Sequence, residues 1–256
     1  FALALGIGAI AGLVADFGIP YSTGRFLAES RDDRGAVVSL LRDSLRLKLA
    51  TAALVTGILF AAAGPIADLY GEPGLAWPIR GIAVSLFFDS VLTLYLTAFI
   101  ALGNQVVNLR LVFFESVAET GSSIALVALG AGATGAAFGR ATGYAVGAVL
   151  AVVVVVRLFG RSALAVQHFP ERSGRTADIA RYAAPLFVTN SAYTLYAQID
   201  ILLVGALLGT TAVGLFAAPL RLAVPLLYLG QAIARSVAPR QARPVRDAAS
   251  VRLFVL

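Results

Sequence analysis

The sequence contains no cysteine and no methionine, and its only histidine is His168. The absence of cysteine excludes disulfide bonds, cysteine-ligated zinc and thiol nucleophiles. Charged residues are also scarce, at 13% of the chain, whereas a typical soluble domain carries about a quarter. Because the sequence starts at Phe1 rather than at a methionine, we expect the chain to be a fragment of a longer protein.

The chain is correspondingly rich in apolar residues. They make up 59% of the chain, and the mean hydropathy is +0.86. A single soluble core of this length could not bury so much apolar surface, so the surplus is expected to face lipid. A helix of about 20 apolar residues spans a bilayer. We therefore predict an all-α, polytopic transmembrane bundle with seven spans, at about residues 1–26, 40–66, 79–102, 112–129, 136–158, 182–208 and 213–234.

Arginine and lysine gather in every second gap between these apolar runs. The rich gaps cover residues 25–48, 110, 157–181 and 235–246, whereas the other gaps hold almost no basic residue. Cytoplasmic loops retain basic residues, so the alternation predicts the direction of each span. The net charge of +6 raises nucleic acid as a partner, but no basic face with interleaved aromatic residues occurs. We interpret the charges as topology determinants beside anionic membrane lipids.

The longest polar stretch, residues 160–178, is the best candidate for a domain boundary. It predicts an N-terminal part at residues 1–158, a cytoplasmic linker at 159–180 and a second part that opens at 181–256. After Val251 the tail becomes apolar again, as if another span began there.

Glycine forms two patterns near residue 135. Gly130, Gly132 and Gly135 spell G-x-G-x-x-G, but a dinucleotide site needs a preceding strand and a later acidic residue, and neither is expected here. Glycines also recur every four residues from Gly135 to Gly147. Such a stripe lets a neighbouring helix approach closely, so we predict a packing interface with no chemistry of its own.

Ionisable residues inside the predicted spans are the sharper functional signal, because such residues usually face a bundle interior or water. They are Arg25, Asp89, Glu115, Glu119, Arg140, Asp200 and Arg221. Glu115 and Glu119 lie one turn apart and share a helix face. For Arg25 and Arg140 the alternative is snorkelling to an interface, and for Glu115 it is pairing with Arg110. Asp16, beside Gly18 and Pro20, is expected to satisfy freed backbone or to pair with Arg25.

The sixth predicted span carries a polar face. Asn190, Tyr193, Thr194 and Gln198 share it, and we expect it to line a solvated path; hydrogen bonding between helices is the alternative. On the seventh span, Pro219 and Pro225 predict kinks. No catalytic motif is present, since His168 lies in a polar loop and the acidic residues lack metal-ligand spacing. We expect no enzymatic activity, no cofactor and no metal site.

Two stretches resemble a known family. DFGIPYSTGRFLAE, from Asp16 to Glu29, is similar to the end of the second span of oligosaccharide-lipid flippases. YTLYAQIDILLVGALLGTTAVGLFAAPLRL, from Tyr193 to Leu222, resembles the start of that family's second lobe more closely. These flippases belong to the multidrug/oligosaccharidyl-lipid/polysaccharide exporter superfamily. The resemblance implies two six-helix lobes around a central cavity, of which this chain would hold helices two to eight.

The resemblance also implies a function: export of a lipid-pyrophosphate-linked oligosaccharide or polysaccharide precursor across the bacterial cytoplasmic membrane by alternating access. Arg25, Arg140 and Arg221 would contact phosphate, and Asn190, Tyr193 and Gln198 the sugar or the cavity wall. Asp89, Glu115, Glu119 and Asp200 would balance these arginines or carry a coupling proton or sodium ion. Three alternatives stay open: a drug/cation antiporter of the same superfamily, a membrane-embedded glycan polymerase or acyltransferase, and a non-transporting scaffold.

Overall fold

The computed structural model describes residues 1–164 and the helical path of residues 174–241. Side-chain contacts are described mainly for residues 1–164 and 181–220. His168, most of the predicted linker and the tail beyond Gln241 lie outside the described residues. The side chain of Arg221 also lies outside them, although its backbone belongs to a helix.

The described residues form helices and no β-strand, which confirms the all-α prediction. In chain order the elements are α1 (Ala2–Asp16), α2 (Ile19–Glu29), α3 (Arg34–Leu69), the 3-10 turn η1 (Pro73–Leu75), α4 (Ala76–Ala101), α5 (Gln105–Leu126), the π-helical turn η2 (Val127–Ala131), α6 (Gly132–Phe159), the 3-10 turn η3 (Arg161–Ala163) and α7 (Gly174–Gln241).

Four helical segments are long and apolar enough to cross a membrane, and the bent pair α1–α2 makes a fifth. The four segments cover Arg34–Leu69, Pro73–Ala101, Gln105–Phe159 and Arg181–Leu220. Two of them contain positive-φ glycines, Gly130 and Gly132 in one and Gly209 in the other, where the backbone leaves the helical conformation. The molecule is thus an all-α membrane helical bundle, and the count of seven spans stays a prediction.

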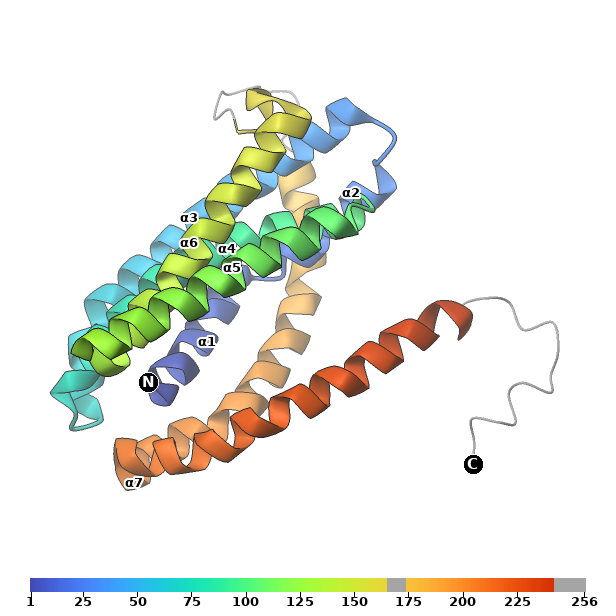
Figure 1. The fold of residues 1–256 in the computed structure, drawn as a ribbon. Coiled ribbons are helices and arrows are strands. Elements are labelled where there is room, and N and C mark those ends of the chain that lie inside the picture. The colour runs from blue at the N-terminus through green and yellow to red at the C-terminus, as the bar shows by residue number, and fades with distance from the viewer. Residues whose placement is uncertain (165–173, 242–256) are drawn as a thin grey trace, which may run out of the picture. The chain divides into compact units, whose positions relative to one another are not determined.

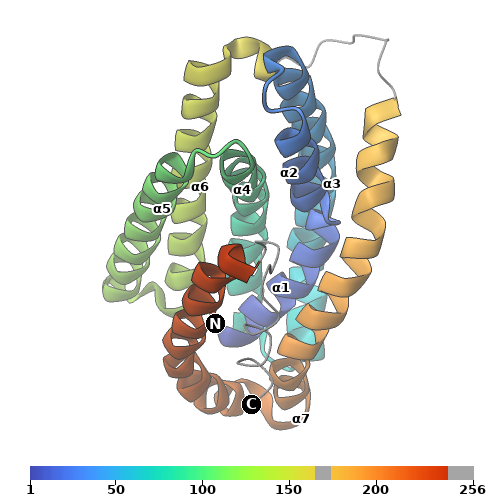
Figure 2. The ribbon, with the colours of Figure 1, turned by 90° about the vertical axis from the view of Figure 1, so that its right-hand side faces the viewer.

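Helix α4 occupies the middle of the first six helices, because it contacts α1, α2, α3, α5 and α6. Figures 1 and 2 show α3 and α6 running beside it. Two apolar cores form along the bundle, one around Tyr95, Phe99 and Leu41, and the other around Leu3, Leu59 and Ile79. Large apolar side chains on α5, such as Phe113, remain exposed, as expected of a surface that faces lipid.

The ends of the helices agree with the predicted alternation of direction. Asp33 caps α3 by accepting a hydrogen bond from the Ala36 amide at 3.0 Å, and the guanidinium of Arg34 donates to the carbonyl of Leu158 at 2.6 Å. The basic gaps at the start of α3 and the end of α6 therefore lie at one end of the bundle (Figure 1). Between α3 and η1, Glu72 accepts a hydrogen bond at 2.9 Å from the hydroxyl of Thr210 on α7.

The glycine stripe of α6 packs against α5, as the four-residue spacing predicts. A Cβ added at Gly143 would lie 2.6 Å from Cα of Glu119, and one added at Gly147 would lie 3.0 Å from Cβ of Glu115. Gly135 and Gly139 approach Leu126 and Ser123 in the same way. Successive glycines therefore face residues one turn further back along α5, and at Gly139 and Gly143 the two backbones are in direct contact.

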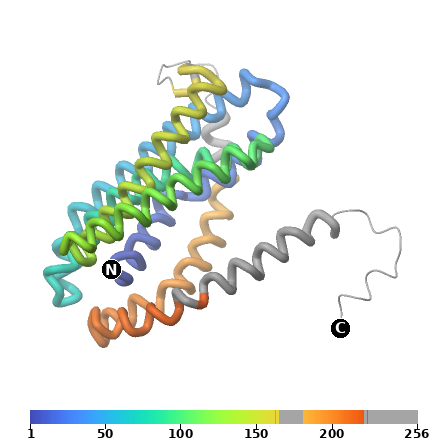
Figure 3. Tube along the Cα trace, in the orientation of Figure 1, coloured from blue at the N-terminus to red at the C-terminus, as the bar shows by residue number. Residues whose placement is uncertain are grey.

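The chain divides into two compact units, Phe1–Val213 and Gly214–Leu256. The first unit contains α1 to α6 and the first part of α7, and it carries the side chains discussed below. Within the second unit the described backbone is helical as far as Gln241. In Figure 3 colour marks the residues whose side chains are described. The predicted boundary in residues 159–180 stays a prediction.

Candidate functional site

The first predicted span is broken between α1 and α2, which meet at an angle of 43°. Phe17 and Gly18 both have positive φ, at 43° and 71°, and Pro20 sits in the first turn of α2, where its missing N–H is tolerated. A Cβ at Gly18 would lie 2.8 Å from the carbonyl oxygen of Ala183 on α7. Glycine therefore meets two demands here: a left-handed backbone and the close approach of another helix.

The break leaves backbone carbonyls at the end of α1 without helical partners. Lys48 of α3 reaches them: its Nζ donates to the carbonyl of Ala15 at 3.1 Å and forms an ion pair with Asp16. Thr51 donates to the same carbonyl at 3.0 Å. The side chain of Lys48 is fully buried, and a cation at a helix C-terminus also complements the helix dipole. The broken helix is thus fastened to α3 by one buried cation.

This position of Lys48 corrects the sequence interpretation. The sequence predicts Lys48 in an amphipathic turn at the start of the span at residues 40–66, beside the inner loop. In the structure α3 begins at Arg34, so Lys48 lies about four turns inside the helix. Asp16 pairs with Lys48 and not with Arg25, which instead bonds Glu29 at 2.9 Å. The signal that could have revealed Lys48 is its place after a capped helix start at Asp33.

A second charged group lies between α5 and α6. Arg140 forms an ion pair with Glu119 at 2.8 Å and donates a hydrogen bond to the hydroxyl of Tyr144 at 2.7 Å. The side chains of Arg140 and Glu119 are 30% and 27% exposed. Arg140 therefore does not only snorkel to an interface, because it has fixed partners on both helices. Tyr144 is a site residue that the sequence analysis did not identify.

Glu115 lies one turn before Glu119 and is more deeply placed, with 7% of its surface exposed. It accepts a hydrogen bond from the Ser116 hydroxyl at 3.1 Å, and it lies against Gly147 of α6 just as Glu119 lies against Gly143. The predicted shared face of these two residues is thereby confirmed.

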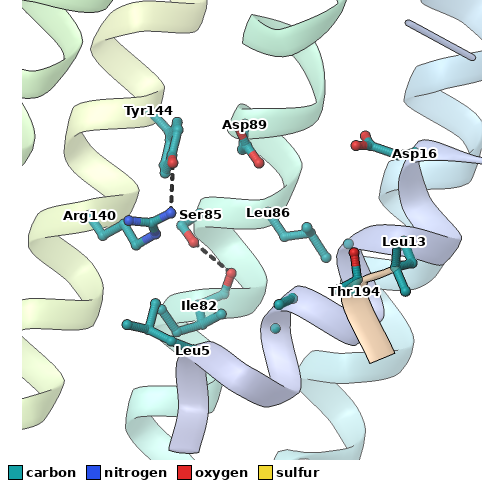
Figure 4. A pocket seen from close by; sticks show the side chains of 13 residues that line it. Leu5, Leu13, Asp16, Ile82, Ser85, Leu86, Asp89, Arg140, Tyr144 and Thr194 are labelled. Carbon is teal, nitrogen blue, oxygen red and sulfur yellow. Dashed lines mark hydrogen bonds between the residues drawn. The ribbon is translucent and has the colours of Figure 1, made fainter. Parts of the chain in front are cut away.

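A cavity of about 320 Å³ lies between α1, α4, α6 and the first part of α7. Figure 4 shows Arg140 and Tyr144 on one side, Asp16 on the other, and Asp89 between them on α4. The full lining is Leu5, Gly8, Ala9, Gly12, Leu13, Asp16, Ile82, Ser85, Leu86, Asp89, Arg140, Tyr144 and Thr194. Its volume is that of a small ligand pocket. Charged side chains therefore line an open cavity between membrane helices.

A second cavity of about 200 Å³ shares Leu13, Asp16 and Thr194 with the first. It is also lined by Asn190 and Tyr193 of α7. Thr194, Asn190 and Tyr193 thus lie along cavities, as the polar face of the sixth span predicts. Gln198 lies further along the same helix, where its Oε1 would be 3.5 Å from a Cβ added at Gly6 of α1.

The remaining predicted site residues are placed elsewhere. Asp89 accepts a hydrogen bond from Thr93 at 3.1 Å and lines the larger cavity. Arg25 is exposed, stacks over the Tyr182 ring at 4.4 Å and lines neither of these cavities. Asp200 is exposed on α7 and lines neither of them. Among the residues that the structure describes, no three acidic or histidine side chains come close enough together to hold a metal ion.

Comparison with known protein families gives a match over residues 1–243 to the family described as "Polysaccharide biosynthesis protein". No curated protein and no solved structure matches the chain. The match covers the broken helix, both charged groups and the cavities, and it extends into the second compact unit. The chain therefore belongs to the polysaccharide biosynthesis protein family.

Proposed function

We propose that this protein is a flippase of the bacterial cytoplasmic membrane. It moves a lipid-pyrophosphate-linked oligosaccharide or polysaccharide precursor across the bilayer by alternating access. Family membership supports the link to polysaccharide biosynthesis, and the apolar helices support a multi-pass membrane location. The substrate would combine a pyrophosphate, a sugar head and a lipid tail, so it needs a polar cavity inside the membrane.

The observation that carries this proposal is Arg140, a half-buried cation that lines a cavity inside a helical membrane bundle. A guanidinium offers five N–H donors in a planar fork, which suits the oxygens of a phosphate. One bond to Glu119 and one to Tyr144 use only part of this capacity. Arg140 can therefore bind a phosphate oxygen while it keeps contact with α5.

Other residues are assigned by their place around the cavities. Asn190 and Tyr193 line the smaller cavity, and with Gln198 they would contact sugar hydroxyls or form the wall. Asp89, Glu115, Glu119 and Asp200 would balance the arginines or carry a coupling proton or sodium ion. Arg25 and Arg221 keep the phosphate-contact role that the sequence gives them, as hypotheses.

A drug/cation antiporter is the second candidate, and one observation favours it. Asp16 and Asp89 line the larger cavity with only one arginine beside them in its lining. Since Asp16 is already paired with Lys48, the carboxylate of Asp89 is the group that would attract an organic cation. Transport of a cationic dye by reconstituted protein, with no transport of lipid-linked glycan, would decide for this candidate.

Replacing Arg140 by alanine tests the flippase proposal. A hydrogen bond to a charged group contributes about 1.5–3 kcal/mol, so we expect R140A to lower glycan transport in proteoliposomes at least about tenfold, with R140K in between. The matched control is R80A, because Arg80 stacks on Trp77 at the end of α4, at 4.8 Å from the ring centroid, and lines neither of these cavities. Equal transport by R140A and R80A would contradict the role of Arg140.

A further inference from the structure

Glu115 is a buried acid, and no cation forms an ion pair with it among the contacts described in the structure. Its side chain lies at the α5–α6 contact, beside Gly147, and is only 7% exposed. The hydroxyl of Ser116 is its one hydrogen-bond donor described in the structure. Burying an ionised carboxylate without a cation is strongly unfavourable. The pairing of Glu115 with its neighbours therefore determines whether it can stay charged.

The nearest neighbour of Glu115 is a second acid. Glu115 and Glu119 lie one helical turn apart on the face of α5 that meets α6, a spacing at which two carboxyl groups can share a hydrogen bond, and ionised carboxylates only accept hydrogen bonds. A bond between them requires one shared proton. The glycine stripe places both acids at the helix contact, because Gly143 lies against the backbone of Glu119 and Gly147 against Cβ and Cγ of Glu115.

Arg140 connects this carboxyl pair to the larger cavity. It bonds Glu119 on one side and lines the cavity on the other. Tyr144 of α6 is another titratable group beside the pair, and Asp89 of α4 lies within electrostatic range of Arg140. With both glutamates ionised, Arg140 would face three carboxylates. An incoming anion would then be repelled.

We infer that Glu115 and Glu119 form a proton-binding pair, and that a phosphate-class anion binds at Arg140 together with one proton held by this pair. The proton enters from water at Glu119, whose side chain is 27% exposed, and is shared with Glu115. One O–H bond forms at the carboxylate as the proton leaves its donor in water, and no other bond changes. The identity of the anion rests on the flippase proposal, whereas the proton pair rests on the contacts of α5 and α6.

The direction of the pH effect follows from linkage. At low pH the pair already holds its proton, so anion affinity is highest and independent of pH. Above the pH at which the free pair loses its proton, each binding event must take up a proton, and affinity falls by about tenfold per pH unit. Glu115→Gln mimics the protonated pair, so its affinity should remain high as pH rises.

Calorimetry of the protein in lipid nanodiscs measures this directly. Geranyl pyrophosphate and inorganic pyrophosphate serve as probes, and titration in two buffers of different ionisation enthalpy gives the protons taken up per anion bound. At high pH we expect close to one proton for the wild type and near zero for E115Q, with affinity retained. D68N is the matched control, because Asp68 is exposed at the end of α3, and it should behave as wild type.

Each outcome separates the two claims. Uptake of one proton per anion by E115Q would overturn the proton pair. Loss of that uptake in D89N would then assign the proton to Asp89. Binding of inorganic pyrophosphate as tight as that of geranyl pyrophosphate would assign the site to a free anion. Failure of both probes to bind wild type at any pH would sink the flippase proposal together with this inference. Should E115Q fail to fold, the infrared band of a protonated carboxyl in the wild type, lost at high pH and restored by the probe, is the independent readout; its absence would contradict the pair.

Discussion

The two ion pairs of the cavity wall differ in how much of each cation remains available. Lys48 is fully buried and is bound to a backbone carbonyl as well as to Asp16. Arg140 is 30% exposed, and its partners, Glu119 and Tyr144, are both side chains. A buried cation that fills a gap in backbone hydrogen bonding cannot be released without loss of structure. A partly exposed guanidinium that bonds only side chains can exchange one of these partners for a ligand.

This contrast assigns a structural role to Lys48 and a binding role to Arg140. The first fastens the broken helix α1–α2 to α3, and the second faces the space between α4 and α6. Both residues pair with an acid, so charge alone does not separate the two roles. Their burial and the nature of their partners do.

The largest expected effect comes from removing the buried cation. K48M leaves Asp16 and the Ala15 carbonyl with fewer partners, and breaking a buried pair costs about 3–5 kcal/mol. Because Asp16 is 43% exposed, we expect the lower end of this range. The thermal unfolding temperature and the abundance in membranes should both fall much further for K48M than for R140A. The double variant D16N/K48M should recover part of the loss, since no unpaired carboxylate remains. Equal stability of K48M and R140A would contradict the contrast.

A smaller effect is expected at the α5–α6 contact, which positions Arg140 against Glu119. G143A places a methyl group against the backbone of Glu119, and overpacking of this kind costs about 1–3 kcal/mol. G121A on α5 is the matched control, because nothing lies within 4 Å of a Cβ added there. Unfolding of each variant in nanodiscs should show a loss for G143A only. Equal stability of the two variants would mean that α6 does not approach α5 closely at Gly143.

Local patterns in the sequence were enough to predict one part of this site. The four-residue spacing from Gly135 to Gly147 predicts close helix packing, and Glu115 and Glu119 share a face by helical periodicity alone. The polar face of residues 190–198 likewise predicts residues that line cavities. These features depend on one helix at a time, so the sequence contains them.

Contacts between helices could not be predicted in the same way. Nothing local indicates that Arg140 meets Glu119, 21 residues earlier, or that Tyr144 completes the group. Lys48 was expected near the start of its span because it follows a run of other basic residues, whereas the structure begins α3 at Arg34 and so places Lys48 deeper in the helix. The pairing of Asp16 with Lys48 instead of Arg25 depends on the same contact between α1 and α3.

The central claim is that Arg140 and its neighbours face an aqueous cavity inside the membrane, and the absence of cysteine from this sequence makes a direct measurement simple. T194C places a thiol on the wall shared by both cavities, and V153C places one on the exposed apolar face of α6. A negatively charged, membrane-impermeant thiol reagent should modify T194C and not V153C, and geranyl pyrophosphate should slow that reaction. Modification of neither thiol, or an equal rate at both, would contradict the account.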